Sequence, residues 1–316
     1  MFILRWLLNY EEDLQQAFTT ADKLLSGLPP SFSQPARDFL DKFHVLKENR
    51  SKNYICYLLP YWLKEKSTVP ITDCRQIAIA NIFGMMYYHL LDDLMDNPEA
   101  RFKHQLPLAD LIHFEFLNIY RSYFPADSPF WPYFRKYIAE WADAVTYENS
   151  NNFFLEAPVR VAHKAAPVKL TVAAICLLSN QENMIPLLED SVDTVLITLQ
   201  MLDDWMDWEK DLKEGSYNCL IALIETKQQL TEMRRPTPDE IRQAIYTQGI
   251  LSEYAQQAET HHQALSGVRC YTQHLYDFHE FLVHNIRQAA KQIEKDRKLL
   301  ENGGLEYWLS KKNSNS

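Results

Sequence analysis

The chain has 316 residues, 47% of them hydrophobic, which is enough apolar material for a sizeable core. Only 7 glycines are present and neither GxGxxG nor GxxxxGK occurs, which excludes a glycine-rich phosphate loop and a dinucleotide fingerprint. The formal net charge of −10 argues against nucleic acid as a partner, because a phosphate backbone requires a basic surface.

Cysteine usage and the apolar segments bear on the compartment. The five cysteines are scattered and include no CxxC pair, which indicates a reducing, cytoplasmic compartment. The N-terminal segment MFILRWLLNYEEDLQQ turns acidic within one helical length and has neither a basic start nor a small-residue cleavage site. No apolar stretch is long enough to cross a membrane, so we expect no integral membrane segment.

Helical periodicity runs through almost the whole chain. We predict helices over residues 35–47, 71–96, 108–124, 130–150, 186–215 and 270–301. Pro158 and Pro167 bracket a short helical segment, and Thr237-Pro238-Asp239-Glu240 is typical of a helix start with a capping box. The sequence shows no strand alternation and no long polar linker. It therefore predicts an all-α, single-domain antiparallel helical bundle over residues 1–310, followed by a disordered tail at 311–316.

One acidic cluster occurs twice, each time at the end of an apolar run. Asp92, Asp93 and Asp96 close MMYYHLLDDLMD, and Asp203, Asp204 and Asp207 close ITLQMLDDWMD. On a helix, residues at i, i+1 and i+4 are close enough for their carboxylates to reach one point. Carboxylates that continue an apolar stripe face inward, where they are costly unless a cation neutralises them. Two such clusters facing each other would hold Mg²⁺, which keeps several waters and binds phosphate, so the sequence predicts a metal–diphosphate site.

Further polar residues have the spacing expected around such a site. Gln200 lies one turn before the second cluster, and Asp211 continues the line of Asp203 by two further turns. Lys164 and Arg160 are spaced i, i+4, so both can present positive charge to one anion, as a leaving diphosphate requires.

Together these motifs resemble the isoprenoid synthase superfamily, in particular its trans-prenyl-diphosphate-synthase branch. HLLDDLMDNPEARF is similar to the first aspartate-rich motif of that branch, with Arg101 as one of its paired arginines, and LQMLDDWMDWEKD is similar to the second. Lys164 matches the diphosphate-binding lysine of the branch. The resemblance covers about residues 45–225. It implies a bundle with a central active-site cavity, three Mg²⁺ ions, a prenyl diphosphate substrate and a homodimer.

The departures from the branch are concentrated in one half of its site. Phe102 stands where the second arginine belongs, residues 48–60 retain only Arg50 and Lys52 of a Gly-Gly-Lys-Arg segment, and Gly215-Ser216 follows the second motif where Gly-Lys is expected. These missing groups belong to the site for the second substrate, isopentenyl diphosphate. Each lost basic residue removes charge-assisted hydrogen bonds worth roughly 1.5–3 kcal/mol.

That asymmetry resembles the bacterial terpene synthases built on a prenyl synthase scaffold. Such an enzyme ionises one prenyl diphosphate, here of fifteen to twenty-five carbons, and the allylic cation cyclises or loses a proton. The resemblance implies that Asp92, Asp93 and Lys164 carry the ionisation. The six aspartates of the two clusters would hold Mg²⁺, and Gln200, Arg160 and Arg101 would bind the diphosphate together with Lys164.

Aromatic residues near the motifs are candidates for the substrate pocket. Tyr87 and Tyr88 lie one turn before the first cluster, where bulky residues form the pocket floor in the elongating relatives and imply a shallow or folded prenyl tail. Phe83, Phe153 and Trp205 are candidates for cation–π contact with a carbocation.

Two other functions stay open on the sequence. One is a trans-prenyltransferase that elongates an allylic diphosphate with isopentenyl diphosphate. The other is a non-catalytic subunit of a heteromeric prenyl synthase, which the retained aspartates disfavour.

Overall fold

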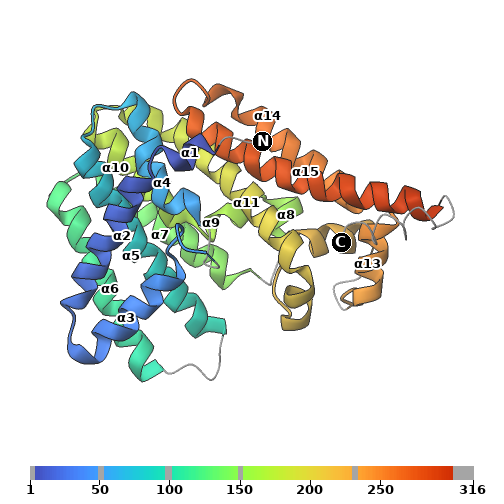
Figure 1. Cartoon of the computed structure of the whole chain (residues 1–316), viewed down its shortest axis with the longest axis horizontal. Coiled ribbons are helices and arrows are strands. Elements are labelled where there is room, and N and C mark those ends of the chain that lie inside the picture. Colours follow the sequence, from blue (N-terminus) through green and yellow to red (C-terminus); the bar gives the residue numbers. More distant parts are fainter. Residues whose placement is uncertain (1–3, 49–52, 97–101, 149–151, 230–233, 302–316) are drawn as a thin grey trace. The chain divides into compact units, whose positions relative to one another are not determined.

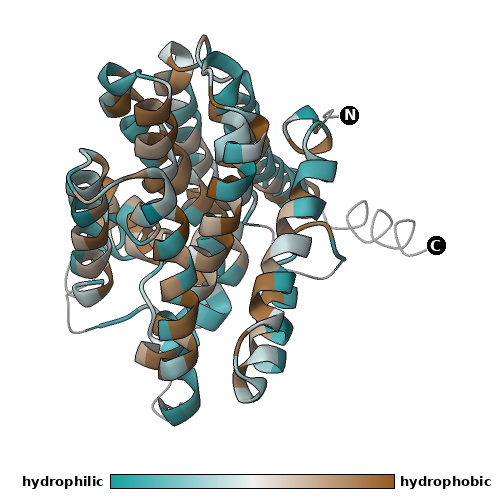
Figure 2. Cartoon of the chain, turned by 90° about the vertical axis from the view of Figure 1, so that its left-hand side faces the viewer, coloured by the Kyte–Doolittle hydropathy of each residue, from teal (hydrophilic) through white to brown (hydrophobic). Residues whose placement is uncertain are grey.

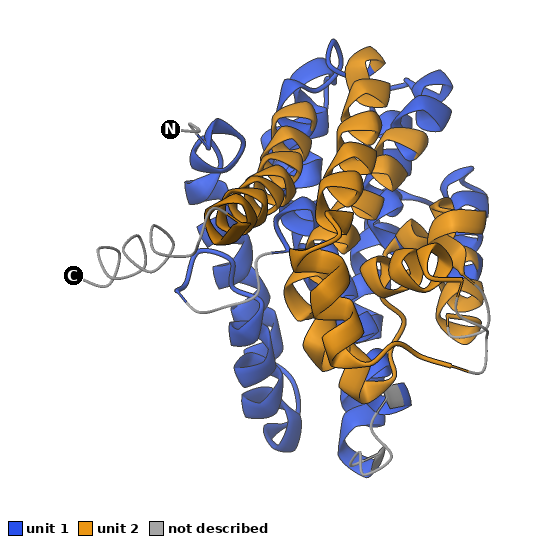
Figure 3. Ribbon diagram, turned by 90° about the vertical axis from the view of Figure 1, so that its right-hand side faces the viewer, with its two compact units in different colours: residues 1–139, 166–189, 268–275 blue, residues 140–165, 190–267, 276–316 orange. Residues whose placement is uncertain are grey.

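The computed structural model describes residues 4–48, 53–96, 102–148, 152–229 and 234–301, and every regular element in these ranges is a helix. Figure 1 labels the helices along the chain. The fold is therefore all-α, as the helical periodicity predicts. The chain divides into two compact units, one of residues 1–139, 166–189 and 268–275 and the other of residues 140–165, 190–267 and 276–316 (Figure 3).

The first unit is organised around one long helix, α5 (Ile71–Asp96), which lies against its neighbours α2, α4 and α6. The helices of this unit are α1 (Arg5–Leu8), α2 (Glu11–Ser26), α3 (Pro30–Lys42), α4 (Tyr54–Leu63), α5, α6 (Phe102–Tyr123), the first part of α7 (Phe130–Thr146) and α10 (Leu170–Leu178). Most of them carry hydrophobic and hydrophilic residues on different faces (Figure 2), the pattern of helices that bury one side.

Close approach between α5 and α6 depends on a glycine. A Cβ atom at Gly84 would lie 3.0 Å from the Phe116 ring of α6, closer than ordinary van der Waals contact. Phe116 is itself packed against Tyr120, with ring centroids 5.4 Å apart and nearly perpendicular planes, so the ring has little room to move. Gly84 therefore lets the two helices pack tightly beside the first acidic motif.

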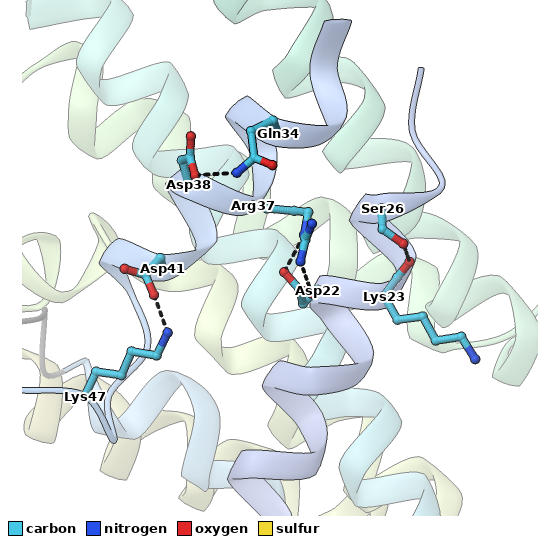
Figure 4. Close-up of polar contacts among 8 residues, drawn as sticks. All are labelled: Asp22, Lys23, Ser26, Gln34, Arg37, Asp38, Asp41 and Lys47. Carbon is cyan, nitrogen blue, oxygen red and sulfur yellow. Dashed lines mark hydrogen bonds and ion pairs between the residues drawn. The ribbon is translucent and has the colours of Figure 1, made fainter. Parts of the chain in front are cut away.

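Helices α2 and α3 are joined by charged contacts at their surface (Figure 4). Arg37 of α3 donates two hydrogen bonds to Asp22 of α2, at 2.7 and 2.9 Å, in a bidentate arrangement. Lys47, which lies in the loop after α3, pairs with Asp41 of α3. These side chains are substantially exposed, so each pair stabilises the fold by about 1 kcal/mol or less.

The second unit contains most of the long helix α11 (Ile185–Glu214) and the helices that contact it. These are α8 (Phe153–Glu156), α9 (Val159–His163), α12 (Cys219–Lys227), α13 (Pro238–Tyr246), α14 (Ile250–Ala264) and α15 (Gln273–Glu301). The Tyr254 hydroxyl of α14 donates to the Met201 carbonyl of α11 at 3.0 Å, and Tyr254 is fully buried. The half-buried His261 of α14 and the buried His279 of α15 both lie within hydrogen-bond distance of Thr198 of α11, and His262 of α14 contacts His279.

Several predicted boundaries are confirmed and others are wrong. The helix over residues 71–96 has the predicted bounds, and the capping box at Thr237 and Glu240 is formed. The helix predicted from Pro35 begins at Pro30 instead, so Pro35 lies inside it. The helix predicted from residue 108 begins at Phe102, with Pro107 inside it.

The division into two units does not test the prediction of one domain, which stays a prediction. The tail predicted at 311–316 lies outside the described residues. Within the described ranges, none of the helices is both long and apolar enough to cross a lipid bilayer. None of the five cysteines, all of which lie in the described ranges, forms a disulfide, and four of them are buried.

Candidate functional site

The second acidic motif lies near the C-terminal end of α11 and presents its carboxylates in two different settings. Asp203 and Asp207 are exposed, one helical turn apart, whereas Asp204 is only 2% exposed. Consecutive helical residues point about 100° apart, because the helix has about 3.6 residues per turn, so neighbours in the sequence can occupy opposite environments. The motif therefore combines a solvent-facing pair with one buried carboxylate.

Asp204 is held by hydrogen bonds to both of its oxygens. Gln200 donates from Nε2 to Oδ1 at 2.6 Å, and the backbone N–H of Cys219 donates to Oδ2 at 2.6 Å. Burial raises the pKa of Asp204 to about 6, while the bonds from Cys219 and Gln200 and the charge of Lys164 act in the opposite direction. The Gln200 side chain is thus bonded to Asp204, which lies within the protein rather than on the exposed side of α11, and the role predicted for Gln200 in binding diphosphate stays a prediction.

The carboxylates of this motif repel one another, which disfavours their ionised forms. Asp203 is accessible to water, but the surrounding protein removes part of its hydration, and this desolvation, followed by repulsion from Asp204, Asp207 and Asp211, raises its pKa to about 6. The pKa of Asp211 is also raised, mainly by burial. A divalent cation bound to the exposed pair would relieve this repulsion.

Lys164 supplies positive charge close to the same motif. It immediately follows α9, and its ammonium group pairs with Glu148. Its charge lowers the pKa of both Asp204 and Asp211 against the stronger effect of burial, which places the ammonium group within electrostatic reach of the motif. The diphosphate-binding role that the resemblance implies for Lys164 stays a prediction.

Arg160 is engaged elsewhere in this structure. Its guanidinium group pairs with Asp143 of α7 and stacks over the Phe153 ring, 4.3 Å from the ring centroid. Phe153 is 4% exposed, so Arg160 covers one face of a largely buried ring. The roles predicted for Arg160 in binding diphosphate and for Phe153 in stabilising a cation stay predictions.

The first acidic motif lies at the end of α5, in the other unit. Asp92 and Asp93 are exposed there, and Asp96 is the last residue of the helix. Burial lowers the pKa of His89, one turn earlier, although the charge of Asp93 acts in the opposite direction. The side chain of Asp96 and the whole of Arg101 lie outside the described residues, so their predicted roles stay predictions.

The aromatic residues before this motif are packed within α5 and α6. Tyr87 stacks on His113 of α6, with ring centroids 4.3 Å apart, and contacts Tyr88 edge-on at 5.0 Å. Phe83, one turn deeper, is fully buried. On α11, Trp205 is partly exposed beside the second motif. Their assignment to a substrate pocket stays a prediction.

Sequence reasoning missed Asn218, which lies 3% exposed between α11 and α12. Its side-chain amide donates to the backbone carbonyl of Asp204 and to Oδ2 of Asp211, each at 2.8 Å. The one available signal was an asparagine directly before the apolar run CLIALI, which is typical of a helix N-cap. Nothing in that pattern indicated a link to the acidic motif.

The donor chemistry of the second motif fits Mg²⁺. Among the residues that the structure describes, no group of three or more histidine, cysteine, aspartate or glutamate side chains is already arranged to hold a metal ion. Mg²⁺ does not require such a cage, because it usually binds through one or two carboxylates and completes its shell with water and substrate phosphate. The exposed pair Asp203 and Asp207 meets that requirement.

Comparison with known proteins identifies the fold. Neither a protein-family profile nor a curated protein matches the sequence. Among solved structures, the chain is similar to a geranylgeranyl pyrophosphate synthetase from the archaeon Geoglobus acetivorans, with a TM-score of 0.62 and 15% identity, over 86% of this chain and 98% of that one. The chain has the isoprenoid synthase fold. At this identity the likeness establishes the fold alone, and within the isoprenoid synthase fold the chemistry has to be argued from the site.

Proposed function

We propose that the protein is a class I terpene synthase, which ionises one prenyl diphosphate of fifteen to twenty-five carbons and releases a cyclised or deprotonated terpene. The observation that carries the proposal is the arrangement around the C-terminal end of α11. Asp203 and Asp207 present exposed carboxylates there, and the charge of Lys164 acts on Asp204 and Asp211 of the same segment. Carboxylates for divalent cations and a cation for phosphate are the groups that a leaving diphosphate needs.

Each residue has a defined task in this proposal. Mg²⁺, when bound, would neutralise the charge that develops on the departing diphosphate. Asp203 and Asp207 hold metal from the second motif, and Asp92 and Asp93 are the corresponding ligands of the first. Lys164 donates to a diphosphate oxygen, exchanging its contact with Glu148 for the more highly charged anion.

We favour ionisation over elongation because basic residues are missing from the motif positions that the resemblance assigns to the second substrate, isopentenyl diphosphate. The chain has Phe102 and Ser216 where the resemblance calls for basic residues. Fewer cations for a second diphosphate favour a reaction that uses one.

A trans-prenyltransferase is the second candidate, and the similarity to a geranylgeranyl pyrophosphate synthetase supports it. In that case isopentenyl diphosphate would attack the allylic cation and the product would keep a diphosphate. We also expect a homodimer, which light scattering after size-exclusion chromatography would test.

Product analysis separates the two candidates. The protein is incubated with Mg²⁺ and geranyl, farnesyl, geranylgeranyl or geranylfarnesyl diphosphate, each alone and each with isopentenyl diphosphate. A hydrocarbon or terpene alcohol formed from a single substrate supports the proposal. A longer prenyl diphosphate that forms only when isopentenyl diphosphate is present would establish the transferase instead.

A further inference from the structure

The segment between α11 and α12 turns the chain back onto the acidic motif. Gly215 adopts φ +79°, a left-handed conformation that favours glycine, directly after α11 ends. Asn218 is then the N-cap of α12, and its Oδ1 accepts hydrogen bonds from the backbone N–H groups of Leu220 and Ile221, at 3.0 and 3.1 Å. Half of the hydrogen-bonding capacity of this side chain therefore starts a helix.

The other half of that capacity is directed at the acidic motif. The Asn218 amide nitrogen donates to the Asp204 carbonyl and to Asp211 Oδ2, each at 2.8 Å, and the adjoining Cys219 N–H donates to Asp204 Oδ2 at 2.6 Å. An asparagine side chain can make four hydrogen bonds, and all four are formed here. A leucine or alanine at this position would leave buried partners unsatisfied.

Tyr217 extends the same segment toward α8. Its hydroxyl accepts from the backbone N–H of Phe154 at 2.8 Å and donates to Asn152 Oδ1 at 3.3 Å. We call Tyr217, Asn218 and Cys219 the clamp. The clamp joins the carboxylates of α11 to the start of α8, a short distance along the chain before Lys164.

The clamp divides the carboxylates of α11 into two groups. Its hydrogen bonds go to Asp204 and Asp211, whereas Asp203 and Asp207 point to the exposed side of the helix. Fixing the first two keeps their negative charge at defined positions and fixes the orientation of the helix end that carries the other two.

We propose that Asn218 is a positioning residue for the metal site, which holds Asp204 and Asp211 in place so that Asp203 and Asp207 are aligned to bind Mg²⁺. This inference rests on the proposed metal-dependent function. It assigns to Asn218 a role that reaches the metal only through the carboxylates it orients.

The substitution N218D tests the role without removing the helix start. Aspartate caps a helix as well as asparagine does, so the bonds to Leu220 and Ile221 remain possible. It has no donors for the Asp204 carbonyl or for Asp211, and it adds a repelling charge. In the double variant N218D/D211N, the hydrogen bond between positions 211 and 218 can form again. The amide at position 211 is then the donor and the carboxylate at position 218 is the acceptor.

The readout is Mn²⁺ binding by the full-length protein in the presence of inorganic diphosphate, followed by electron paramagnetic resonance of the free ion, with no turnover involved. We expect N218D to weaken Mn²⁺ affinity about tenfold or more, which corresponds to about 1.4 kcal/mol or more. The double variant should bind more tightly than N218D but less tightly than the wild type, because it regains the bond between positions 211 and 218 and not the bond to the Asp204 carbonyl. N118D, which adds the same charge on the exposed side of α6, is the matched control and should bind as the wild type does.

Unchanged affinity in N218D, or a double variant as weak as N218D, would overturn the inference. N218S provides a second variant, which keeps the cap and replaces the two amide donors with one shorter hydroxyl without adding charge, and it should weaken binding if N218D fails to fold. Product analysis is independent of this measurement. Suppose that the protein binds Mn²⁺ with the predicted dependence on Asn218 and yet forms no terpene. That result would refute the proposed function and leave the positioning role standing. If the wild-type protein binds no Mn²⁺, the positioning role itself is refuted.

Discussion

His279 of α15 should make the protein less stable in mild acid. Its side chain is fully buried, with Nδ1 3.0 Å from Nδ1 of His262 and Nε2 2.9 Å from Oγ1 of Thr198. Burial, followed by the neighbouring charges of His262 and His261, lowers the pKa of His279 from 6.5 to about 2. The folded protein therefore keeps this histidine neutral at every pH at which the unfolded chain would begin to protonate it.

The magnitude follows from proton linkage. Because the unfolded state binds the additional proton below pH 6.5, this contribution to stability is fully present above the unfolded pKa and is lost as the pH falls. Between about pH 7.5 and about pH 5.5 the loss from one such histidine is about 1.4 kcal/mol. The raised pKa values of Asp203 and Asp204, about 6 each, act in the opposite direction over part of this range, since the folded state holds those protons more tightly.

Comparison with the variant His279→Gln isolates the histidine, because the carboxylate contributions are common to both proteins. Glutamine has a donor and an acceptor for the same neighbours and does not titrate. Other charged groups around the site are also retained in the variant, namely Glu280, which lies 2.9 Å from His262, and Arg287, which contacts Glu280.

The free energy of unfolding is measured by urea denaturation at both pH values. Its decrease on acidification should be smaller by about 1.4 kcal/mol in the variant than in the wild type. Replacement of His104, which is exposed on α6, by glutamine controls for the loss of a histidine as such. The same decrease in wild type and His279→Gln would refute the reasoning.

Further predictions concern the acidic motifs and the packing of α5. Asp203→Ala and Asp92→Ala should each abolish Mg²⁺-dependent turnover while circular dichroism stays helical, and full activity in either variant would remove its metal assignment. Because the pKa of Asp203 is raised to about 6, Mn²⁺ affinity should fall as the pH is lowered through this value, and a flat profile between about pH 7 and about pH 5 would contradict the assignment. Gly84→Val should lower the free energy of unfolding by about 1–3 kcal/mol, since even a Cβ would meet Phe116 at 3.0 Å, whereas Gly267→Val, with open space around its Cβ, should have little effect.

The long helices could be predicted from the sequence because their apolar residues follow one period without interruption. The α5 helix, Ile71–Asp96, has no proline and one glycine, and its bounds were predicted correctly. The first residue of the shorter helix α3 was not predicted, because both Pro30 and Pro35 can begin a helix and only packing selects the first.

The candidate site was predictable only in part. Repetition of the aspartates indicated the two motifs, and resemblance indicated Lys164. The different burial of Asp203 and Asp204 depends on which side of α11 is covered, and the role of Asn218 depends on a turn that brings it back to the same helix. Local spacing carries no information about such tertiary contacts.

The proposed function requires that the protein ionises one prenyl diphosphate without joining it to a second. It is tested most directly by supplying a single prenyl diphosphate with Mg²⁺, adding isotopically labelled isopentenyl diphosphate, and following both the release of inorganic diphosphate and the fate of the label. We expect one diphosphate to be released per unlabelled terpene formed, at a rate that does not depend on isopentenyl diphosphate. Label incorporated into a longer prenyl diphosphate, with no terpene from the single substrate, would contradict it.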